Sequence, residues 1–191
     1  VHLFRNMTWA TRLAASTNFG VSRLVYFMGG VDNWIAPKFN STIWVDQTKN
    51  YQYQTLATSM RGFSQNTRNG TSFALLSTEL RMPVVQLVTG KKISRPFFNS
   101  IQLIAFADLG TAWTGLTPYS EENCLYTRYI DSGNIHAVVK RQVDPWIIGV
   151  GAGLRASLLG YFLRFDYAWG IENFQVADKK GMFLFSIGTD F

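Results

Sequence analysis

Apolar and polar residues alternate along most of this 191-residue chain with a period of two. Such alternation is typical of β-strands whose two faces meet different surroundings. Transmembrane β-strands need ~9–11 residues, whereas most strands of globular proteins have ~5–6. No segment has a convincing helical pattern. We predict an all-β fold from the seven long alternating segments, at roughly 2–15, 20–29, 70–83, 98–112, 146–157, 161–170 and 182–191.

The predicted connections differ in length in a regular way. The segments at 16–20 and around Gly160 are short and 84–97 is intermediate, whereas 30–69 and 113–145 are long and 171–181 is longer again than the turn before it. Outer-membrane barrels have short turns on one side of the membrane and long loops on the other. The pattern therefore favours 30–69 and 113–145 as long extracellular loops.

The two faces of each strand carry different residues. In 98–112, Leu103, Ala105 and Ala107 share an apolar face, and Asp108 lies on the other. Charges of both signs recur near the middle of other strands, where they need water or partners. A polar lumen surrounded by lipid-facing residues provides both. We therefore predict an antiparallel transmembrane β-barrel, whose lumen wall carries Glu79, Arg81, Asp108, Arg155, Arg164 and Asp166.

Composition supports this interpretation. Only 16% of the residues are charged, against ~25% in soluble domains, and 15% are aromatic. No window approaches the ~18 uninterrupted apolar residues of a membrane helix. The net charge of +6 would suit a nucleic-acid binder, but the lysines and arginines are scattered, so we predict no nucleic-acid partner.

Residues suited to catalysis are sparse. The chain has one cysteine, Cys124, and two widely separated histidines, His2 and His136. It shows neither a Ser-His-Asp or Cys-His arrangement nor a phosphate-binding loop. We predict that the protein is not an enzyme and has no catalytic residues, no metal site and no cofactor.

Several short motifs occur in an order that resembles a known family. They are FMGGVDNW (27–34), MRGF (60–63), STELRMP (77–83), FADLGTAW (106–113), GVGAGLR (149–155), LRFDYAWG (163–170) and the terminal FLFSIGTDF. Together they resemble the bacterial surface antigen superfamily of outer-membrane assembly and secretion barrels, of the BamA, TamA and FhaC type. The resemblance identifies residues 1–191 as the C-terminal part of a probable sixteen-strand barrel, a fragment of a larger protein.

The resemblance also implies a function and a location. The protein is expected to be integral to the bacterial outer membrane, where it inserts and assembles outer-membrane proteins or translocates polypeptide. Expected partners are outer-membrane lipids, unfolded outer-membrane or secreted polypeptides, and accessory lipoproteins or periplasmic chaperones. Two alternatives stay open: a barrel that anchors an N-terminal periplasmic or surface domain, and a soluble lipid-binding β-barrel.

The family further implies a role for MRGF, at the tip of the long loop. The loop is expected to fold back into the lumen, where Arg61 pairs with Asp108 or, alternatively, with Asp166. Gly62 permits a close approach, and Phe63 is expected to wedge against the glycines of 149–153. The terminal strand is expected to act as the insertion signal through Phe183, Phe185, Ile187 and Phe191.

Overall fold

The computed structural model describes residues 2–3, 7–43, 45, 51–90, 96–120, 123, 126–132, 135–141 and 143–188. Its main element is an antiparallel eight-stranded sheet in the order β1-β2-β6-β7-β10-β11-β12, with β13 also paired to β11. Two of these strands, β1 (His2–Leu3) and β12 (Gln175–Val176), have only two residues. The long strands are β2 (Met7–Thr17), β6 (Ser72–Pro83), β7 (Gln102–Trp113), β10 (Ile147–Leu158), β11 (Tyr161–Glu172) and β13 (Met182–Gly188).

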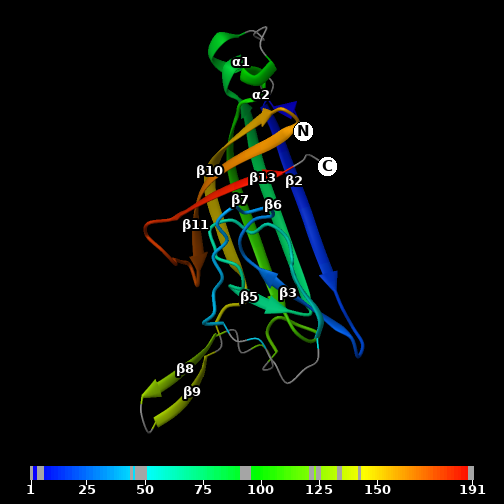
Figure 1. Ribbon diagram of the computed structural model, residues 1–191, viewed down its shortest axis with the longest axis vertical. Helices are drawn as coiled ribbons and strands as arrows, with labels where there is room; N and C mark the ends of the chain where they lie inside the picture. Colours follow the sequence, from blue (N-terminus) through cyan, green and yellow to red (C-terminus); the bar gives the residue numbers. More distant parts are fainter. Residues whose placement is uncertain are drawn as a thin grey trace.

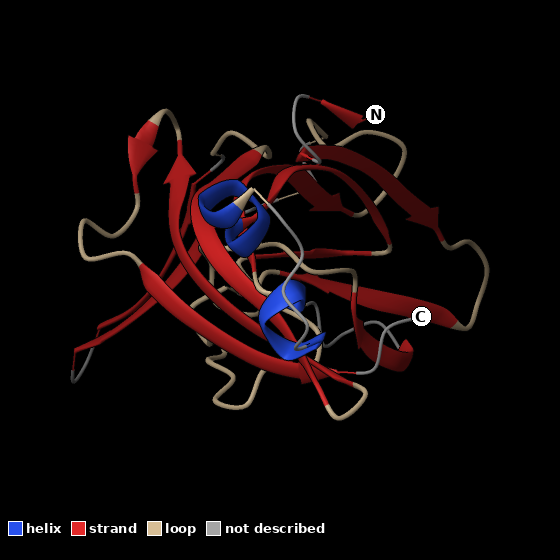
Figure 2. Ribbon diagram, turned by 90° about the horizontal axis from the view of Figure 1, so that it is seen from above, coloured by secondary structure: helices blue, strands red, loops and turns tan. Residues whose placement is uncertain are grey.

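The sheet forms an incomplete barrel wall. Seen from above, it curves around segments of the long loop (Figure 2). Among the described residues, no pairing joins β2 to β13, so the wall is open between them. The predicted fold class, an all-β antiparallel portion of a barrel, is confirmed. Among the described residues, no helix has the length and hydropathy needed to cross a membrane.

One predicted barrel strand lies elsewhere. β2 pairs directly with β6, from Thr8 opposite Arg81 to Thr17 opposite Ser72. The whole segment 18–71 is therefore one loop, longer than the predicted 30–69. Within it, β3 (Arg23–Met28), the strand predicted at 20–29, lies between β4 (Tyr51–Leu56) and β5 (Arg68–Gly70) in a separate three-stranded sheet. The prediction was wrong because an alternating pattern identifies a strand but not its partners.

Two short helices lie where the sequence predicted none, in the turn between β6 and β7. They are α1 (Val84–Thr89) and α2 (Pro96–Ser100). Pro83, in an extended conformation, precedes α1, and Gly90 ends it with φ +70° and an N–H donated to the Gln86 carbonyl. This left-handed cap is a common helix ending. A single turn of helix is too short to give a helical period in the sequence.

The long and short connections lie at opposite ends of the sheet (Figure 1). The loop end carries 18–71, the connection 114–146 with its projecting hairpin of β8 (Tyr126–Ser132) and β9 (Ile135–Arg141), and 173–181. The turn end carries the helices and the tight turn at 159–160. The first residues of β2 and the last residues of β13 both lie toward the turn end, because the long strands of the described sheet number six rather than seven.

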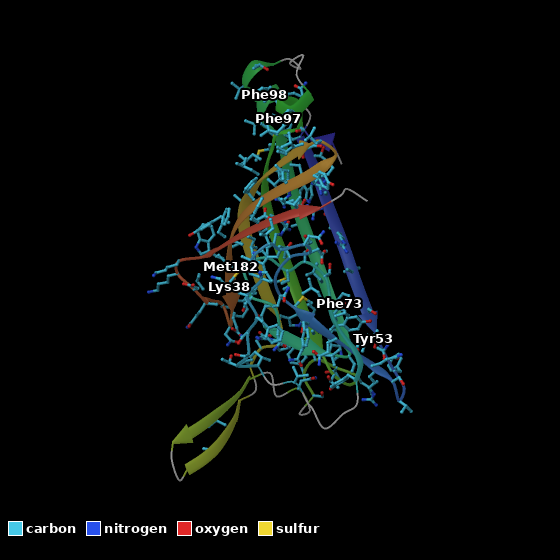
Figure 3. All side chains as sticks on the ribbon, in the orientation of Figure 1. Lys38, Tyr53, Phe73, Phe97, Phe98 and Met182 are labelled. Atoms are coloured by element: carbon cyan, nitrogen blue, oxygen red, sulfur yellow. The ribbon has the colours of Figure 1, made fainter. Side chains whose placement is uncertain are left out.

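The loop supplies five of the thirteen buried residues in the two hydrophobic core clusters. Two buried clusters form between loop and sheet, each with residues from both. The first contains Met28, Met60, Phe63, Phe73, Leu75, Ala112 and Ile147, and the second contains Val31, Trp34, Ile104, Phe106, Ala168 and Leu184. Figure 3 shows Phe73 toward the loop end and Phe97 and Phe98, of α2, at the turn end. The loop is therefore packed into the fold rather than solvated.

The outward faces of the strands stay apolar and uncovered. Large hydrophobic side chains there are exposed on every long strand, in positions that alternate with the core residues. They are Trp9, Leu13, Leu76, Leu103, Leu154, Leu158, Tyr161, Tyr167, Phe183 and Ile187. A soluble monomer rarely exposes a continuous apolar surface across a whole sheet. The face is therefore suited to contact with lipid.

Candidate functional site

The tip of the long loop is fastened to the wall through Arg61. Its Nε donates to Asp108 Oδ2 at 2.7 Å and its Nη2 to Asp108 Oδ1 at 2.6 Å, a bidentate pair. Its backbone N–H also donates to Oδ2, at 3.3 Å. Arg61 is 5% exposed and Asp108 1%. The structure thus brings together the two residues that the sequence analysis paired, and it does so with the planar geometry that lysine cannot reproduce.

The neighbouring strand β6 completes the Arg61 site. Arg61 Nη1 donates to Glu79 Oε1 at 2.5 Å, and Nη2 donates to Ser77 Oγ at 3.1 Å. Ser77 in turn donates to Asp108 Oδ1 at 2.6 Å. The guanidinium carbon lies 3.7 Å from the centre of the Phe106 ring, a cation–π contact. Sequence reasoning placed Glu79 on the polar face but missed its role as a second partner, and it missed Ser77.

Asp166, the alternative partner predicted for Arg61, is bonded to a different arginine. Arg155 Nη1 donates to Asp166 Oδ1 at 2.5 Å, and Nη2 donates to Oδ2 at 3.1 Å. This pair joins the adjacent strands β10 and β11 within the wall. Arg155 Nη2 also lies 3.9 Å from Glu79 Oε1. Asp166 therefore belongs to the same ion-pair network but is not a direct anchor of the loop.

Glycines allow the loop backbone to lie against the wall. Gly62 has φ +88°, and a Cβ there would come within 2.8 Å of the Trp169 carbonyl group. A Cβ at Gly149 would lie 2.0 Å from the Arg61 carbonyl oxygen, and one at Gly170 would lie 2.7 Å from the Phe63 ring. The sequence analysis expected Phe63 to pack on the glycines of 149–153. That expectation was wrong, because Phe63 packs on Gly170 instead. Only Gly149 of that run faces the motif, through the Arg61 carbonyl.

Electrostatics keeps Arg61 charged despite its burial. Loss of hydration by itself lowers the pKa of a buried guanidinium. The hydrogen bonds and negative charge of Asp108, with the charge of Glu79, outweigh this and raise the pKa of Arg61 above its ordinary value. Arg61 therefore stays a cation and pairs with carboxylates on two strands, β6 and β7.

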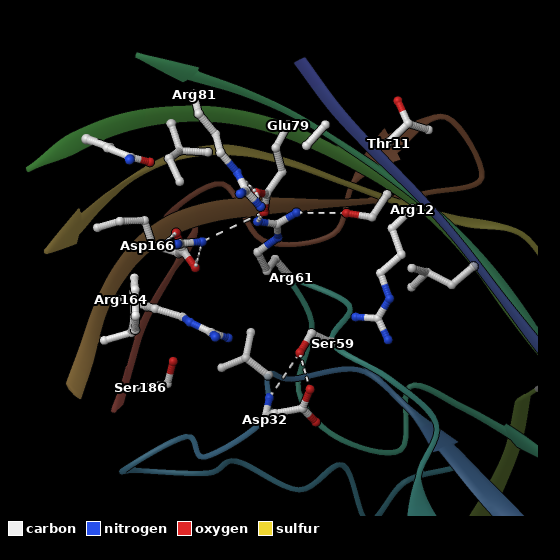
Figure 4. A pocket seen from close by; sticks show the side chains of 18 of the residues that line it. Thr11, Arg12, Asp32, Ser59, Arg61, Glu79, Arg81, Arg164, Asp166 and Ser186 are labelled. Atoms are coloured by element: carbon white, nitrogen blue, oxygen red, sulfur yellow. Dashed lines mark hydrogen bonds and ion pairs between the residues drawn. The ribbon is translucent and has the colours of Figure 1, made fainter. Parts of the chain in front are cut away.

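A polar cavity of about 530 Å³ lies beside the network (Figure 4). Its wall includes the arginines Arg12, Arg61, Arg81, Arg155 and Arg164 and the acidic residues Asp32, Glu79 and Asp166. Strand positions that face it alternate with the apolar positions of the outer surface. This inner surface is polar and charged, as the interior of a transmembrane β-barrel is.

Comparison with known proteins agrees with this geometry. The family model described as "Omp85 superfamily domain" matches residues 11–191. The chain belongs to the Omp85 superfamily. A search of curated proteins and a search of solved structures each found no match. The resemblance inferred from the ordered motifs is thereby confirmed, and with it an outer-membrane β-barrel class whose members assemble or secrete proteins and act on unfolded polypeptides.

A second buried arginine, missed by sequence reasoning, holds the other end of the Omp85 loop. Arg68, in β5, is 1% exposed and donates from Nη2 to Glu172 Oε1 at 2.5 Å, at the end of β11. Nη2 also donates to the Asp144 carbonyl at 3.1 Å. One feature of the sequence could have indicated Arg68. It is the last residue of the mostly polar run RGFSQNTR, which begins at Arg61 and ends just before the strand predicted at 70–83. The loop is thus fixed at two separate points.

The last strand of the Omp85 domain presents its predicted signal residues outward. Phe183 is 59% exposed and Ile187 37% exposed, while the Phe185 ring stacks on Phe165 with centroids 4.6 Å apart. All three side chains lie on the apolar outer face. Phe191, the fourth predicted residue, lies outside the described residues.

Proposed function

We propose that this chain is the C-terminal part of an outer-membrane barrel that inserts outer-membrane proteins or passes polypeptide across the membrane, with the MRGF loop as a fastened lumen plug. The observation that carries the proposal is the burial of Arg61 between Asp108 and Glu79 inside a polar cavity. A wall with an apolar exterior and a charged interior is built to separate lipid from a polar passage. No covalent chemistry is part of the proposed function.

The way in which the loop is held supports a transport role. A loop packed only by apolar contacts would be a permanent part of the core. Ion pairs next to a water-filled cavity can exchange protein partners for water at a smaller net cost, because burying the charges offsets much of their attraction. Apolar contacts in the two core clusters also hold the loop, so the ion-paired tip around Arg61 is the part suited to shift when polypeptide passes.

The terminal strand has a proposed role of its own. The side chains of Phe183, Phe185 and Ile187 form an apolar, largely aromatic surface on the outer face of β13, where it can contact the membrane. Together with Phe191 they constitute the proposed insertion signal of the chain. The alternative of a soluble lipid-binding barrel is disfavoured, because the apolar residues face outward and the charges line the interior.

Reconstitution tests the proposed function. The full-length protein in liposomes should accelerate the folding of a urea-denatured outer-membrane protein added outside, seen as protease-resistant, heat-modifiable barrel in the bilayer. A translocating protein should instead deliver an unfolded secreted polypeptide to the protease-protected vesicle interior. Liposomes without the protein are the control. Neither activity above that control would refute the proposal.

Membrane topology gives a separate test. We expect the loop end to face outside the cell and the turn end to face the periplasm. Single cysteines at Leu116 (93% exposed) and Phe174 (89%) should react with an impermeant maleimide on intact cells, and one at Leu159 (90%) should react only after lysis. A Cys124→Ser background removes the native thiol. Because the three positions are almost equally exposed, burial cannot explain a difference in their labelling. The opposite labelling pattern would show that the expected orientation in the membrane is wrong.

A further inference from the structure

Two arginines lie directly opposite each other on the lumen face of the wall. Arg155 of β10 and Arg164 of β11 are cross-strand partners in an antiparallel pair, and both line the polar cavity. Like charges in directly opposed positions destabilise a sheet. Natural proteins depart from such local rules mainly at functional sites. The pair therefore indicates a place where negative charge is needed.

Asp166 supplies negative charge to Arg155 alone. Its carboxylate lies over Gly153 of the neighbouring strand, in the space that a Cβ at that glycine would fill. There it accepts two hydrogen bonds from Arg155. Among the residues that the structure describes, none forms a hydrogen bond or an ion pair with the Arg164 side chain. Arg164 is thus a half-buried cation that this part of the chain does not neutralise.

Donor groups flank the two arginines in a row across the wall. Ser186 of β13 lies opposite Arg164, and Gln102 of β7 lies opposite Arg155. Both line the cavity, and Ser186 is 3% exposed. Figure 4 shows the Arg164 side chain reaching into the cavity close to Ser186. A hydroxyl, two guanidinium groups and an amide therefore offer N–H and O–H donors to one small region.

The long loop closes this region from the opposite side. Asp32 and Ser59 line the cavity from the loop and face the wall that carries Arg164 (Figure 4). The Ser59 hydroxyl donates to Asp32 Oδ2 at 2.9 Å and accepts from the Asp32 N–H at 3.1 Å. These bonds hold Asp32 on the loop. The cavity of about 530 Å³ between loop and wall is large enough for a carboxylate or phosphate group.

The charges around the cavity favour an anion. Five arginines and three acidic residues line it, and Asp108, outside the lining, pairs with Arg61. Five cations against four carboxylates leave one positive charge in excess. Clefts in which one sign of charge prevails attract counter-ions and raise their local concentration.

We propose that Arg164, together with Arg155 and Ser186, forms an oxyanion-binding site in the lumen, which takes a carboxylate or phosphate group. A guanidinium binds such groups through two parallel hydrogen bonds. An anion between Arg164 and Arg155 would also offset their repulsion. The site goes beyond the proposed function, because it holds for insertion and for translocation alike. Its ligand is an acidic side chain of a polypeptide or a small phosphate-bearing solute, and the test separates the two.

Binding of an acidic peptide tests the site. The probe is dye-labelled hexaglutamate, added to the full-length protein in non-ionic detergent and followed by fluorescence anisotropy, with hexaglutamine as the uncharged comparison. We expect Arg164→Gln to bind hexaglutamate roughly tenfold more weakly than the unsubstituted protein does. Arg164→Lys should fall between the two, because an ammonium group keeps the charge but not the planar fork. Asp32→Asn should bind more tightly, because it removes a negative charge that faces the site.

Arg23→Gln is the matched control. Arg23 lies at the start of β3, outside the cavity, and its Nε donates to the Gly20 carbonyl at 2.9 Å. This variant should bind hexaglutamate as tightly as the unsubstituted protein. Arg164→Gln should keep the heat-modifiable gel mobility of a folded barrel, because the Arg164 side chain forms no bond that holds the described part of the wall.

Competition identifies the source of the anion. If phosphate displaces hexaglutamate more effectively than sodium chloride of the same ionic strength, the site takes small oxyanions. Equal effects of the two salts assign it to acidic polypeptide, and both results support the site.

Two results would overturn the proposal. One is equal affinity of Arg164→Gln and the unsubstituted protein, and the other is no preference for hexaglutamate over hexaglutamine. The second would also follow if an acidic side chain elsewhere in the barrel neutralised Arg164. A protein that is active in the liposome assay but gives either result refutes the site alone, because binding is measured here without insertion or translocation.

Discussion

Replacing Arg61 with alanine should release the tip of the long loop from the wall and impair assembly or secretion, while the barrel wall itself and the Arg68 end of the loop stay in place. The substitution leaves Asp108 and Glu79 without their shared cation, and Asp108 is fully buried. Breaking one partner out of a buried pair costs up to ~3–5 kcal/mol. The measurements are limited proteolysis within 18–71, the temperature at which the protein loses its heat-modifiable gel mobility, and activity in liposomes.

Matched variants show whether the effect belongs to the anchor. Arg61→Lys should rescue poorly, because one ammonium group cannot reproduce the bidentate contact with Asp108 plus the bond to Glu79. Arg61→Asp combined with Asp108→Arg should recover part of the loss. Arg155→Ala removes an arginine that pairs within the wall, and it should leave the loop resistant to protease. Equal loop cleavage in the Arg61 and Arg155 variants would contradict the anchor.

An arginine at Phe185 should destabilise the inserted barrel by ~2–4 kcal/mol, the range for a cation facing lipid near the bilayer midplane. Phe185 lies on the apolar outer face, so the charge would enter hydrocarbon and the stacking contact with Phe165 would be lost. The free energy of unfolding, measured by urea titration in lipid vesicles, is the readout.

The control for Phe185 uses the same chemical change on the other face of the wall. Phe162, in β11, lines the polar cavity together with Arg164. Phe162→Arg should cost under ~1 kcal/mol, because the guanidinium stays in water beside other solvated charges. Ser186 is not a suitable control, since it is 3% exposed and lies opposite Trp34. Equal costs for Phe185→Arg and Phe162→Arg would contradict the assignment of lipid and lumen faces.

The sequence alone determined which face of each wall strand points inward. A period of two is a local property, and a single misassigned residue would reverse a whole strand. Asp108 and Phe185 were therefore placed correctly on the lumen and outer faces. The order of the motifs indicated the family. The resemblance to that family then predicted that Arg61 pairs with Asp108.

Only the tertiary structure decided which elements meet. The strand at 23–28 has the local pattern of a wall strand, yet it lies inside the loop because β2 pairs with β6 across 54 intervening residues, 18 to 71. Strand register and loop packing determine three contacts that the sequence did not predict. Arg61 bonds to Ser77 and Glu79, and Asp166 pairs with Arg155. Phe63 packs on Gly170 and not on the glycines of 149–153. These are long-range relations, fixed by which backbone edges bond and which cavities side chains fill, and no local periodicity encodes them.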